Sequence, residues 1–313
     1  MRSMIKILYL YNKDNWALHN TGKLWFSDIP NYFSVDMINY HSIKHNFDEF
    51  CKEYDYIWFG YLYMYVKFNY DPDRSIVSVH DPMELFPQVS EWKSCPPLEE
   101  DIKVLQSLKY ISTVSTELFM ALQDNNIKSY VLPTTTLLPY RNETQIQKNN
   151  SLVVISVANE YPRKNLKLLY IIASELNERG IVCNFKIGQQ IMPEGEYIQM
   201  LDGGSIYICT SYQEGGPLPA MDAMARGCVV ITTPVGQMME IIQDGYNGYI
   251  CSTKEQFLEK IAYLANNPEQ LHTMRLASSD TLQQKRSRDI ISKKVANFLF
   301  TLSQYFYENI SKV

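Results

Sequence analysis

Short apolar runs alternate with helical stretches along this chain, and this alternation limits its fold more than any other feature. Such alternation is typical of parallel sheets whose faces are covered by helices. In the first half, we predict strands at 5–11, 35–40, 56–59, 75–79, 110–114 and 129–132. In the second half, we predict strands at 152–157, 182–187, 205–209 and 229–232. The sequence therefore predicts an α/β protein with two parallel sheets.

Helix signals separate several of these strands. We predict helices at 116–124, 166–177, 218–225 and 289–313. Either Ser115 or Thr116 is expected to cap the first of them, because short hydroxyl side chains accept hydrogen bonds from helix N-termini. Gly180 and Gly227 follow the ends of the second and third, where glycine readily adopts the left-handed conformation. The terminal helix, rich in Phe, Leu and Tyr, is expected to pack back toward the first half.

One polar segment, at 139–151, offers few residues that could face a core, as is typical of a linker. The length of 313 residues is about twice that of a usual single domain. We therefore expect one Rossmann-like domain over 1–145, a second over 151–288, and a terminal helix over 289–313. The two domains are expected to face each other across a central cleft. In parallel sheets, ligands bind at the carboxyl ends of the strands.

Charge and cysteine content exclude several classes of protein. A net charge of -5 argues against a dedicated nucleic-acid binder, which would be strongly basic. The six cysteines are scattered without zinc-like spacing, so we expect no metal site and a reducing compartment. No apolar run has the length of a membrane span, and the N-terminal run is too short for a secretory signal. We expect a cytoplasmic protein, and nothing in the sequence demands peripheral attachment to the inner face of the membrane.

The stretch 205–251 contains the highest density of candidate catalytic and ligand-binding residues. A predicted strand ends at Cys209, a loop with Glu214 and two glycines follows, and prolines stand at the start of the next helix. Glycines let backbone N–H groups approach an anion closely, and the helix dipole favours negative charge at this end. Asp222 lies eight residues after Glu214, so both carboxylates can border one ligand. A carboxylate near a bound phosphate needs hydroxyl donors, and sugar hydroxyls are the obvious ones.

This stretch resembles the retaining glycosyltransferases of family 4, among the glycosyl transferases group 1, which have the GT-B architecture of two Rossmann-like domains. The family pattern places Glu, seven residues and a second Glu around a glycine-rich loop and a helix, with Asp-Gly-x-Asn-Gly further on. Glu214 and Asp222 occupy the two acidic positions here, and 244–248 matches the later motif. The resemblance covers roughly fifty residues of the second half.

The resemblance implies that the second domain binds a nucleotide-diphosphate sugar of the UDP or GDP type. It implies that Glu214 contacts the donor sugar and that Asp222, with a shorter side chain than the family's Glu, holds the ribose. The donor-binding residues expected on this basis are Arg163, Lys164, Glu214, Gly215, Gly216, Pro217, Leu218 and Asp222.

Two adjacent cations, Arg163 and Lys164, follow the first strand of the second domain. Cations at a strand end can neutralise a diphosphate, and Arg can bind it through two N–H groups. Lys164-Asn165 matches the family's Lys followed by Gly or Asn. The family's Arg, five or six residues upstream, is absent because Asn159 or Ala158 stands there, and Arg163 is a candidate to replace it.

The first half matches the family less fully. His80 and Asp81 follow the 75–79 strand and resemble the family's His-Asp segment on the acceptor side. On this basis Glu214, Lys164 and His80 are the expected catalytic residues. A structural histidine at a strand end, and for Asp81 an N-cap before Pro82, are the alternative interpretations. The glycine pair after the family's first strand is missing.

The implied activity is metal-independent, retaining transfer of a hexose from the donor to a hydroxyl acceptor, without a cofactor, in glycan, polysaccharide or glycoconjugate biosynthesis. The acceptor would be a glycan, a lipid-linked glycan or a small molecule, with no nucleic acid involved. The alternative is a catalytically weak GT-B-like subunit that binds a nucleotide or glycan and supports a partner transferase. The missing upstream Arg and the replacement of Glu by Asp222 favour this alternative.

Three other features have structural rather than functional interpretations. Asp71-Pro72-Asp73 spells a metal-binding Asp-x-Asp, but it precedes a strand and contains a proline, which indicates a turn. The aromatic run at 58–70 is typical of core packing, with a sugar-stacking rim as the alternative. The basic residues of 285–288 indicate a solvated turn before the last helix.

Overall fold

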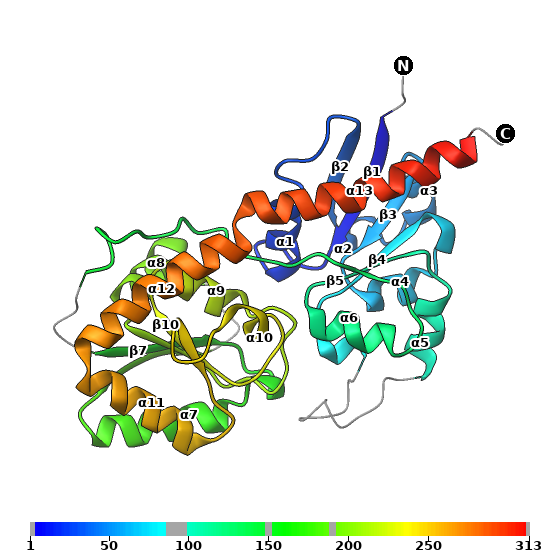
Figure 1. Ribbon diagram of the computed structural model, residues 1–313. Coiled ribbons are helices and arrows are strands. Elements are labelled where there is room, and N and C mark those ends of the chain that lie inside the picture. Colours follow the sequence, from blue (N-terminus) through cyan, green and yellow to red (C-terminus); the bar gives the residue numbers. More distant parts are fainter. Residues whose placement is uncertain (1–3, 86–98, 148–151, 188–191, 311–313) are drawn as a thin grey trace. The chain divides into compact units, whose positions relative to one another are not determined.

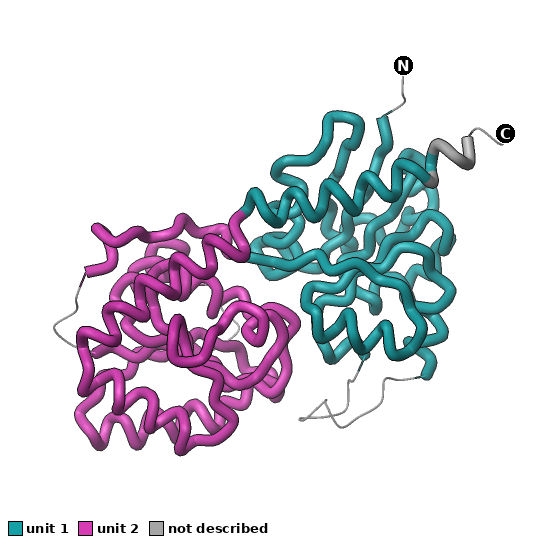
Figure 2. The backbone as a smooth tube through the Cα atoms, viewed as in Figure 1, with its two compact units in different colours: residues 1–88, 95–135, 288–313 teal, residues 89–94, 136–287 magenta. Residues whose placement is uncertain are grey.

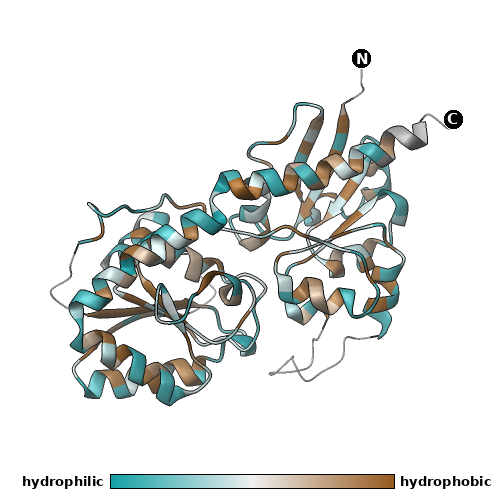
Figure 3. Cartoon of the chain, in the orientation of Figure 1, coloured by the Kyte–Doolittle hydropathy of each residue, from teal (hydrophilic) through white to brown (hydrophobic). Residues whose placement is uncertain are grey.

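The computed structural model describes residues 4–85, 99–147, 152–187 and 192–310. They divide into two compact units (Figures 1 and 2). Of the described residues, the first unit contains 4–85, 99–135 and 288–310, and the second contains 136–287. The chain therefore passes from one unit to the other after Thr135 and returns after Ser287. In each unit the strands carry mostly hydrophobic residues, whereas the helices show a polar and an apolar side (Figure 3).

The first unit is built on a parallel sheet with the strand order β2-β1-β3-β4-β5-β6. Its strands are β1 (Ile5–Tyr11), β2 (Phe33–Asn39), β3 (Tyr56–Phe59), β4 (Ser75–Val79), β5 (Tyr110–Thr113) and β6 (Tyr130–Val131). Every residue of β3, β4 and β5 is buried, as expected for inner strands with both faces covered. The carboxyl ends of these strands consequently lie along one edge of the sheet.

Seven helices accompany this sheet within the described residues. They are α1 (Ala17–Trp25), α2 (Tyr40–Ile43), α3 (Phe47–Cys51), α4 (Leu62–Phe68), α5 (Glu99–Gln106), α6 (Thr116–Gln123) and α13 (Arg288–Ile310). Ser115 caps α6, because its hydroxyl accepts a hydrogen bond from the Leu118 N–H at 3.3 Å. Phe298 of α13 is buried against Trp58, with ring centroids 5.3 Å apart, so the terminal helix forms part of this unit's core.

The second unit is built on a parallel sheet with the strand order β11-β10-β9-β7-β8. Its strands are β7 (Val153–Ala158), β8 (Val182–Ile187), β9 (Ile206–Cys209), β10 (Val229–Thr232) and β11 (Gly248–Ile250). Its helices are α7 (Leu166–Glu178), α8 (Glu194–Gly203), α9 (Leu218–Ala225), α10 (Met238–Ile241), α11 (Lys254–Asn266) and α12 (Pro268–Arg286). Strands β7 and β9 are neighbours, so the loops that follow them emerge side by side.

The polar segment predicted as a linker is attached to the second unit. The Arg226 guanidinium donates to the Pro139 carbonyl oxygen at 2.9 Å, and Arg275 donates to the Gln147 carbonyl oxygen at 2.9 Å. Ile146 is buried against Gly227, where an added Cβ would come within 2.6 Å of it. Because these contacts begin near Thr136, residues 136–145 cluster with the second unit rather than with the first.

The basic residues before the last helix require a correction. The prediction of a solvated turn at 285–288 is wrong, because Lys285 and Arg286 form the last turn of α12. Arg286 is buried and pairs with Glu240 at 2.6 Å, while the Lys285 ammonium donates to the Glu240 carbonyl oxygen at 3.1 Å. Charge alone suggested a solvated segment, but both cations have partners on α10.

Among the described residues, no helix combines the length and apolar character needed to cross a bilayer.

Candidate active site

The loop between β9 and α9 has the local structure that its sequence predicts. Strand β9 ends at Cys209, and α9 begins at Leu218 directly after Pro217, with Pro219 in its first turn. Proline fits there because the first N–H groups of a helix have no partner within the helix. The loop therefore carries Glu214, Gly215 and Gly216 to the helix N-terminus.

Glu214 is the centre of this loop, and its side chain is almost fully buried, with 5% of the residue exposed. Its Oε2 atom lies 2.7 Å from Arg163 Nη1, and its Oε1 atom pairs with Lys164 Nζ. The Ser211 hydroxyl also donates to Oε1, at 2.8 Å. Burial alone would raise the pKa of this carboxyl, but the charges of Arg163 and Lys164 outweigh it and lower the pKa to about 2. Glu214 is therefore ionised and pairs with both cations, so the three side chains together keep one positive charge.

Arg163 and Lys164 reach Glu214 from the 3-10 turn Pro162–Lys164, which follows β7. Asn165 ends this turn in the left-handed conformation, with φ of 50°, and caps α7 by accepting from the Leu168 N–H. Arg163 also donates to the Gln213 carbonyl oxygen at 3.0 Å. Although neighbouring residues often point apart, these two side chains converge on one carboxylate. The structure thus brings the predicted cations and Glu214 together.

Sequence reasoning missed Gly236, which supports the Glu214 loop. It has φ of 43°, and a Cβ there would lie 2.2 Å from the Glu214 carbonyl oxygen and 2.3 Å from that of Gly215. The next residue, Gln237, donates its backbone N–H to the Gly215 carbonyl oxygen at 3.0 Å. Only glycine fits this position. The signal was present in Pro234-Val235-Gly236, a turn directly after a strand.

Asp222, the second acid, finds hydroxyl donors within the chain. Thr136 donates to its Oδ1 atom at 2.5 Å, and Tyr197 of α8 donates to its Oδ2 atom at 2.8 Å. Burial raises the pKa of Asp222 to about 6, while these two hydrogen bonds lower it. The sequence suggested sugar hydroxyls as the donors, whereas the fold itself supplies two.

His80 lies at the carboxyl end of β4 in the first unit and is 9% exposed. Its ring centroid is 5.3 Å from that of Trp25, and within the described part of the chain its Nε2 atom has no hydrogen-bond partner. Burial lowers the pKa of His80 to about 3, so the imidazole is neutral at physiological pH. Asp81 caps the following 3-10 turn by accepting from the Met83 N–H at 3.0 Å, as the alternative interpretation of this residue predicts.

A partly buried glutamate, Glu84, organises this part of the first unit and was not singled out from the sequence. It accepts hydrogen bonds from three backbone N–H groups, those of His80 at 2.6 Å, Asp81 at 2.9 Å and Leu62 at 2.8 Å. Burial raises the pKa of Glu84 to about 8, although these hydrogen bonds lower it. Glu84 therefore ties the loop after β4 to the start of α4. An Asp followed three residues later by Glu, around a proline, was the available capping signal.

Both aspartates of the Asp-x-Asp motif have structural partners in the first unit. Asp71 accepts from the Asp73 N–H at 2.9 Å and caps a 3-10 turn, and Asp73 pairs with Lys109 at 2.6 Å. The turn predicted from the proline is confirmed. Across the residues that the structure describes, no three His, Cys, Asp or Glu side chains gather in a way that could hold a metal ion.

The aromatic run is divided between core and surface. Trp58 and Phe59 are buried in the first unit, whereas Tyr63 and Val66 of α4 are exposed. Core packing is confirmed for the strand portion. The sugar-stacking alternative for the exposed portion stays a prediction.

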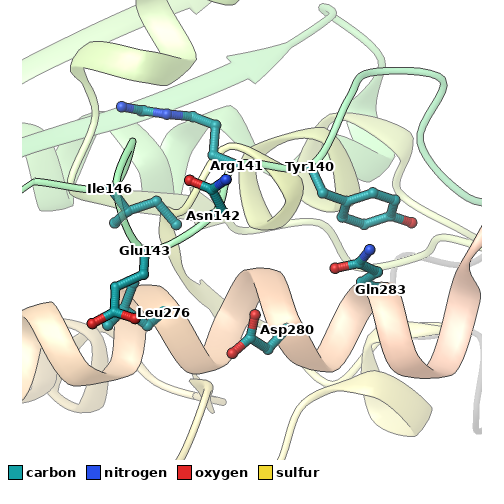
Figure 4. Close-up of a pocket in the computed structure, with 8 residues that line it drawn as sticks. All are labelled: Tyr140, Arg141, Asn142, Glu143, Ile146, Leu276, Asp280 and Gln283. Atoms are coloured by element: carbon teal, nitrogen blue, oxygen red, sulfur yellow. The ribbon is translucent and has the colours of Figure 1, made fainter.

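A pocket of about 390 Å³ lies in the second unit (Figure 4). It is lined by Tyr140, Arg141, Asn142, Glu143, Ile146, Leu276, Asp280 and Gln283. Asp280 and Gln283 project from α12 toward the segment that carries Tyr140 and Asn142 (Figure 4). None of the predicted donor-binding residues lines this pocket, so it belongs to the junction of that segment with α12.

Comparison with known proteins finds a family match in the second unit and gives the fold of the chain. Residues 184–279 match the family model described as glycosyl transferases group 1. This range lies within the second unit. It contains Glu214, Asp222 and Gly236, so the match includes the loop described above. No curated protein sequence matches the chain.

Solved structures show that the chain has the GT-B fold. Sucrose-phosphate synthase from Thermosynechococcus elongatus is similar with a TM-score of 0.72 and 14% identity, over 99% of this chain and 100% of that one. Anabaena Alr3699/HepE in complex with UDP and glucose has a TM-score of 0.67 and 13% identity, over 95% and 100%. S. aureus TarM, in complex with fondaparinux, α-GlcNAc-glycerol and UDP, has a TM-score of 0.64 and 15% identity, over 77% and 54%. The prediction of two Rossmann-like domains in a GT-B protein is confirmed.

Proposed function

We propose that this protein is a retaining glycosyltransferase that moves a hexose from a nucleotide-diphosphate sugar to a hydroxyl acceptor. The observation that carries the proposal is the convergence of Arg163 and Lys164 on buried Glu214, in a glycine-containing loop before α9. Two cations and an acid at neighbouring strand ends supply what an activated sugar needs, namely positive charge for the diphosphate and a hydrogen-bond acceptor for the sugar. The group 1 match over the same loop supports it.

In this proposal the diphosphate is bound by the two cations that pair with Glu214 in the ligand-free protein. Lys164 and Arg163 offset the charge that develops on the departing diphosphate, which is stabilisation of the transition state. Backbone N–H groups of Gly215, Gly216 and Leu218, next to Pro217, add donors at the helix N-terminus. The mechanism requires no metal ion and no cofactor.

The two acids would bind different parts of the donor. Glu214 orients the sugar, because its carboxylate can accept from sugar hydroxyls once the diphosphate shares its cations. Asp222 accepts from the ribose hydroxyls with the lone pairs that Thr136 and Tyr197 leave unused. Retention means that the acceptor attacks from the face that the diphosphate leaves, whose oxygen takes the acceptor proton.

The first unit would supply the acceptor side. His80 has a neutral ring with a buried, unpartnered Nε2 atom among the described residues, so we assign it to positioning a hydroxyl rather than to carrying a charge. Asp81 would lie beside it. The acceptor is a glycan, a lipid-linked glycan or a small molecule, in glycan, polysaccharide or glycoconjugate biosynthesis. We propose a cytoplasmic location, with peripheral contact at the inner face of the membrane as an option for a lipid-linked acceptor.

UDP is the first donor nucleotide to test, because HepE binds UDP and glucose and TarM was solved with UDP. The decisive experiment incubates the protein with UDP- and GDP-sugars and measures the released nucleoside diphosphate. Glu214→Ala and Lys164→Ala should each abolish turnover, while Glu214→Ala retains binding of the nucleotide, which lacks the sugar. Strict dependence of turnover on a divalent ion would contradict the metal-independent mechanism.

The alternative is a weakly catalytic subunit that binds a nucleotide or glycan for a partner transferase. Asp222 favours it, because the fold already satisfies both of its carboxylate oxygens. Saturable nucleotide binding without turnover on any acceptor would support the subunit and contradict the enzyme. A thermal-shift series with UDP, GDP and their sugars comes first, since a ligand that binds only the native state raises its melting temperature.

A further inference from the structure

The turn after β10 is the support on which the Glu214 loop rests. Gly236 approaches the Glu214 and Gly215 carbonyl oxygens so closely that a side chain cannot be added, and the Gln237 N–H bonds to the Gly215 carbonyl oxygen at 3.0 Å. Gln237 is fully buried. A shift of this turn would therefore move the backbone on either side of Gly215.

Arg286 holds this turn from the end of α12. Its Nε atom donates to Gln237 Oε1 at 3.3 Å, and its Nη2 atom donates to Glu240 Oε2 at 2.6 Å. A planar guanidinium holds its two partners in a fixed relative geometry, whereas the donors of an ammonium group rotate freely. Arg286 thus joins the side chain of the turn residue Gln237 to that of Glu240 on α10.

Arg286 also stands next to the junction between the two units. It is the last residue of α12 and lies two residues before Arg288, where α13 and the return to the first unit begin. Arg286 therefore lies next to the point where the chain leaves the second unit, and its side chain contacts the turn that supports the Glu214 loop.

We propose that Arg286 is a positioning residue for nucleotide-diphosphate binding: it acts through Gln237 to hold the Glu214 loop in its binding conformation. The inference rests on the proposed function, because it assigns a role toward the same ligand. Arg286 touches neither Arg163 nor Lys164 in the contacts above, so it changes binding only through the loop backbone.

The same helix offers a matched control. Arg275 of α12 is 2% exposed and donates to the Gly227 carbonyl oxygen at 2.7 Å and to the Gln147 carbonyl oxygen at 2.9 Å. These partners lie at the end of α9 and in the segment before β7. Removing Arg275 therefore takes away a buried arginine of the same helix without removing a contact to the Gly236–Gln237 turn.

The first test compares the affinity for UDP of Arg286→Met and Arg275→Met by isothermal titration. We expect a Kd about tenfold higher for Arg286→Met, and a change of less than about twofold for Arg275→Met even where its melting temperature falls further. Glu240→Gln is the milder variant, expected to raise the Kd about threefold if Arg286→Met does not fold. Equal changes in the two arginine variants, or an unchanged Kd in Arg286→Met or Glu240→Gln, would overturn the proposal.

The second test needs no ligand and separates this inference from the proposed function. Amide hydrogen exchange is measured on full-length protein for the segments 211–217 and 236–242. We expect Arg286→Met or Glu240→Gln to speed exchange in both segments, and Arg275→Met to leave them as in wild type. If wild type binds no nucleotide, the proposed function fails while this measurement still decides whether Arg286 holds the loop; unchanged exchange overturns that role.

Discussion

Two glutamates, one in each unit, show opposite ways of placing a carboxylate at the end of a strand. Glu214 in the second unit is surrounded by side-chain cations, which lower its pKa to about 2. Glu84 in the first unit is held by three backbone N–H groups, and burial raises its pKa to about 8. Both residues follow a parallel strand closely, so the difference comes from the partners and not from the fold.

Glu214 is suited to exchanging its partners for a ligand, whereas Glu84 is suited to supporting the backbone. The partners of Glu214 are flexible side chains with full charges, and an incoming diphosphate can share them. The partners of Glu84 are backbone groups that cannot leave without unfolding the loop. We therefore expect ligand chemistry at Glu214 and structural support at Glu84, and four predictions test this contrast.

Glu214→Gln should give the largest effect. Arg163 and Lys164 would lose their shared counter-charge while staying largely shielded from solvent, at a cost of about 3 kcal/mol in the free energy of unfolding. Urea unfolding at pH 7 measures this loss. Adding Lys164→Met should restore part of it, because one unpaired cation is removed as well. A loss below about 1 kcal/mol would show that solvent or other groups already balance the two cations.

The sign of the pH effect at Glu214 follows from its lowered pKa. The folded carboxyl has a pKa of about 2 against an ordinary 4.5, so its stabilising contribution is present above pH 4.5 and is lost as the pH falls toward 2. In Glu214→Gln this part of the acid sensitivity should disappear.

Gly236→Ala is expected to cost somewhat less stability and to prevent nucleotide binding. The added Cβ would meet two carbonyl oxygens of the Glu214 loop, and φ of 43° is strained for alanine, so about 2 kcal/mol is expected. Gly245→Ala is the control: its φ of 79° is also positive, but nothing lies within 4 Å, so about 1 kcal/mol is expected. Thermal melts with and without UDP compare them. Equal behaviour of the two variants would contradict the contact.

Glu84→Gln should change the pH dependence of stability in the opposite direction from Glu214→Gln. Because the pKa of Glu84 is raised from 4.5 to about 8, its contribution is complete below pH 4.5 and is lost as the pH rises through 8. Wild type should therefore lose stability relative to Glu84→Gln between pH 5 and 8, on the order of 2 kcal/mol. Melting temperatures of both proteins across this range test the prediction. A constant difference would show that the backbone donors keep Glu84 ionised throughout.

Asp222→Asn should give the smallest change in stability. The amide oxygen can still accept from Thr136 or Tyr197, so a loss of about 1 kcal/mol is expected. The affinity for UDP is the informative measurement. A Kd raised about tenfold would support a ribose contact, and an unchanged Kd with reduced stability would assign Asp222 to holding Thr136 and Tyr197 in place.

Local patterns in the sequence were sufficient for most of the sheet framework and for the Glu214 loop. Strands β1, β3, β4, β8 and β10 have the predicted bounds, because short runs of mostly apolar residues, alternating with polar ones in β8, leave few other options. Helix α9 also has its predicted bounds, since Pro217 and Gly227 mark its ends. The resemblance to the glycosyl transferases group 1 was recognisable for the same reason: the motif lies in one continuous stretch.

Features that depend on distant partners could not be predicted. The convergence of Arg163 and Lys164 on Glu214 joins loops about fifty residues apart. Thr136 bonds to Asp222 across 86 residues, and nothing in either local sequence indicates the pair. Arg286 looked like a solvated charge because its partners lie on α10. In each case the side chain's role is set by which loops the sheet order brings together.

The composition of the first unit has a consequence for the order of folding during synthesis. Phe298 of α13 packs on Trp58 and on Tyr130, so the early-encoded unit lacks part of its interior until residues near the far end of this sequence have been translated. The described residues of the second unit, 136–147, 152–187 and 192–287, all precede α13 in the sequence. During translation, the described residues of the second unit are therefore all synthesised before α13 completes the core of the first unit. This is the reverse of the usual N-terminal-first order of folding.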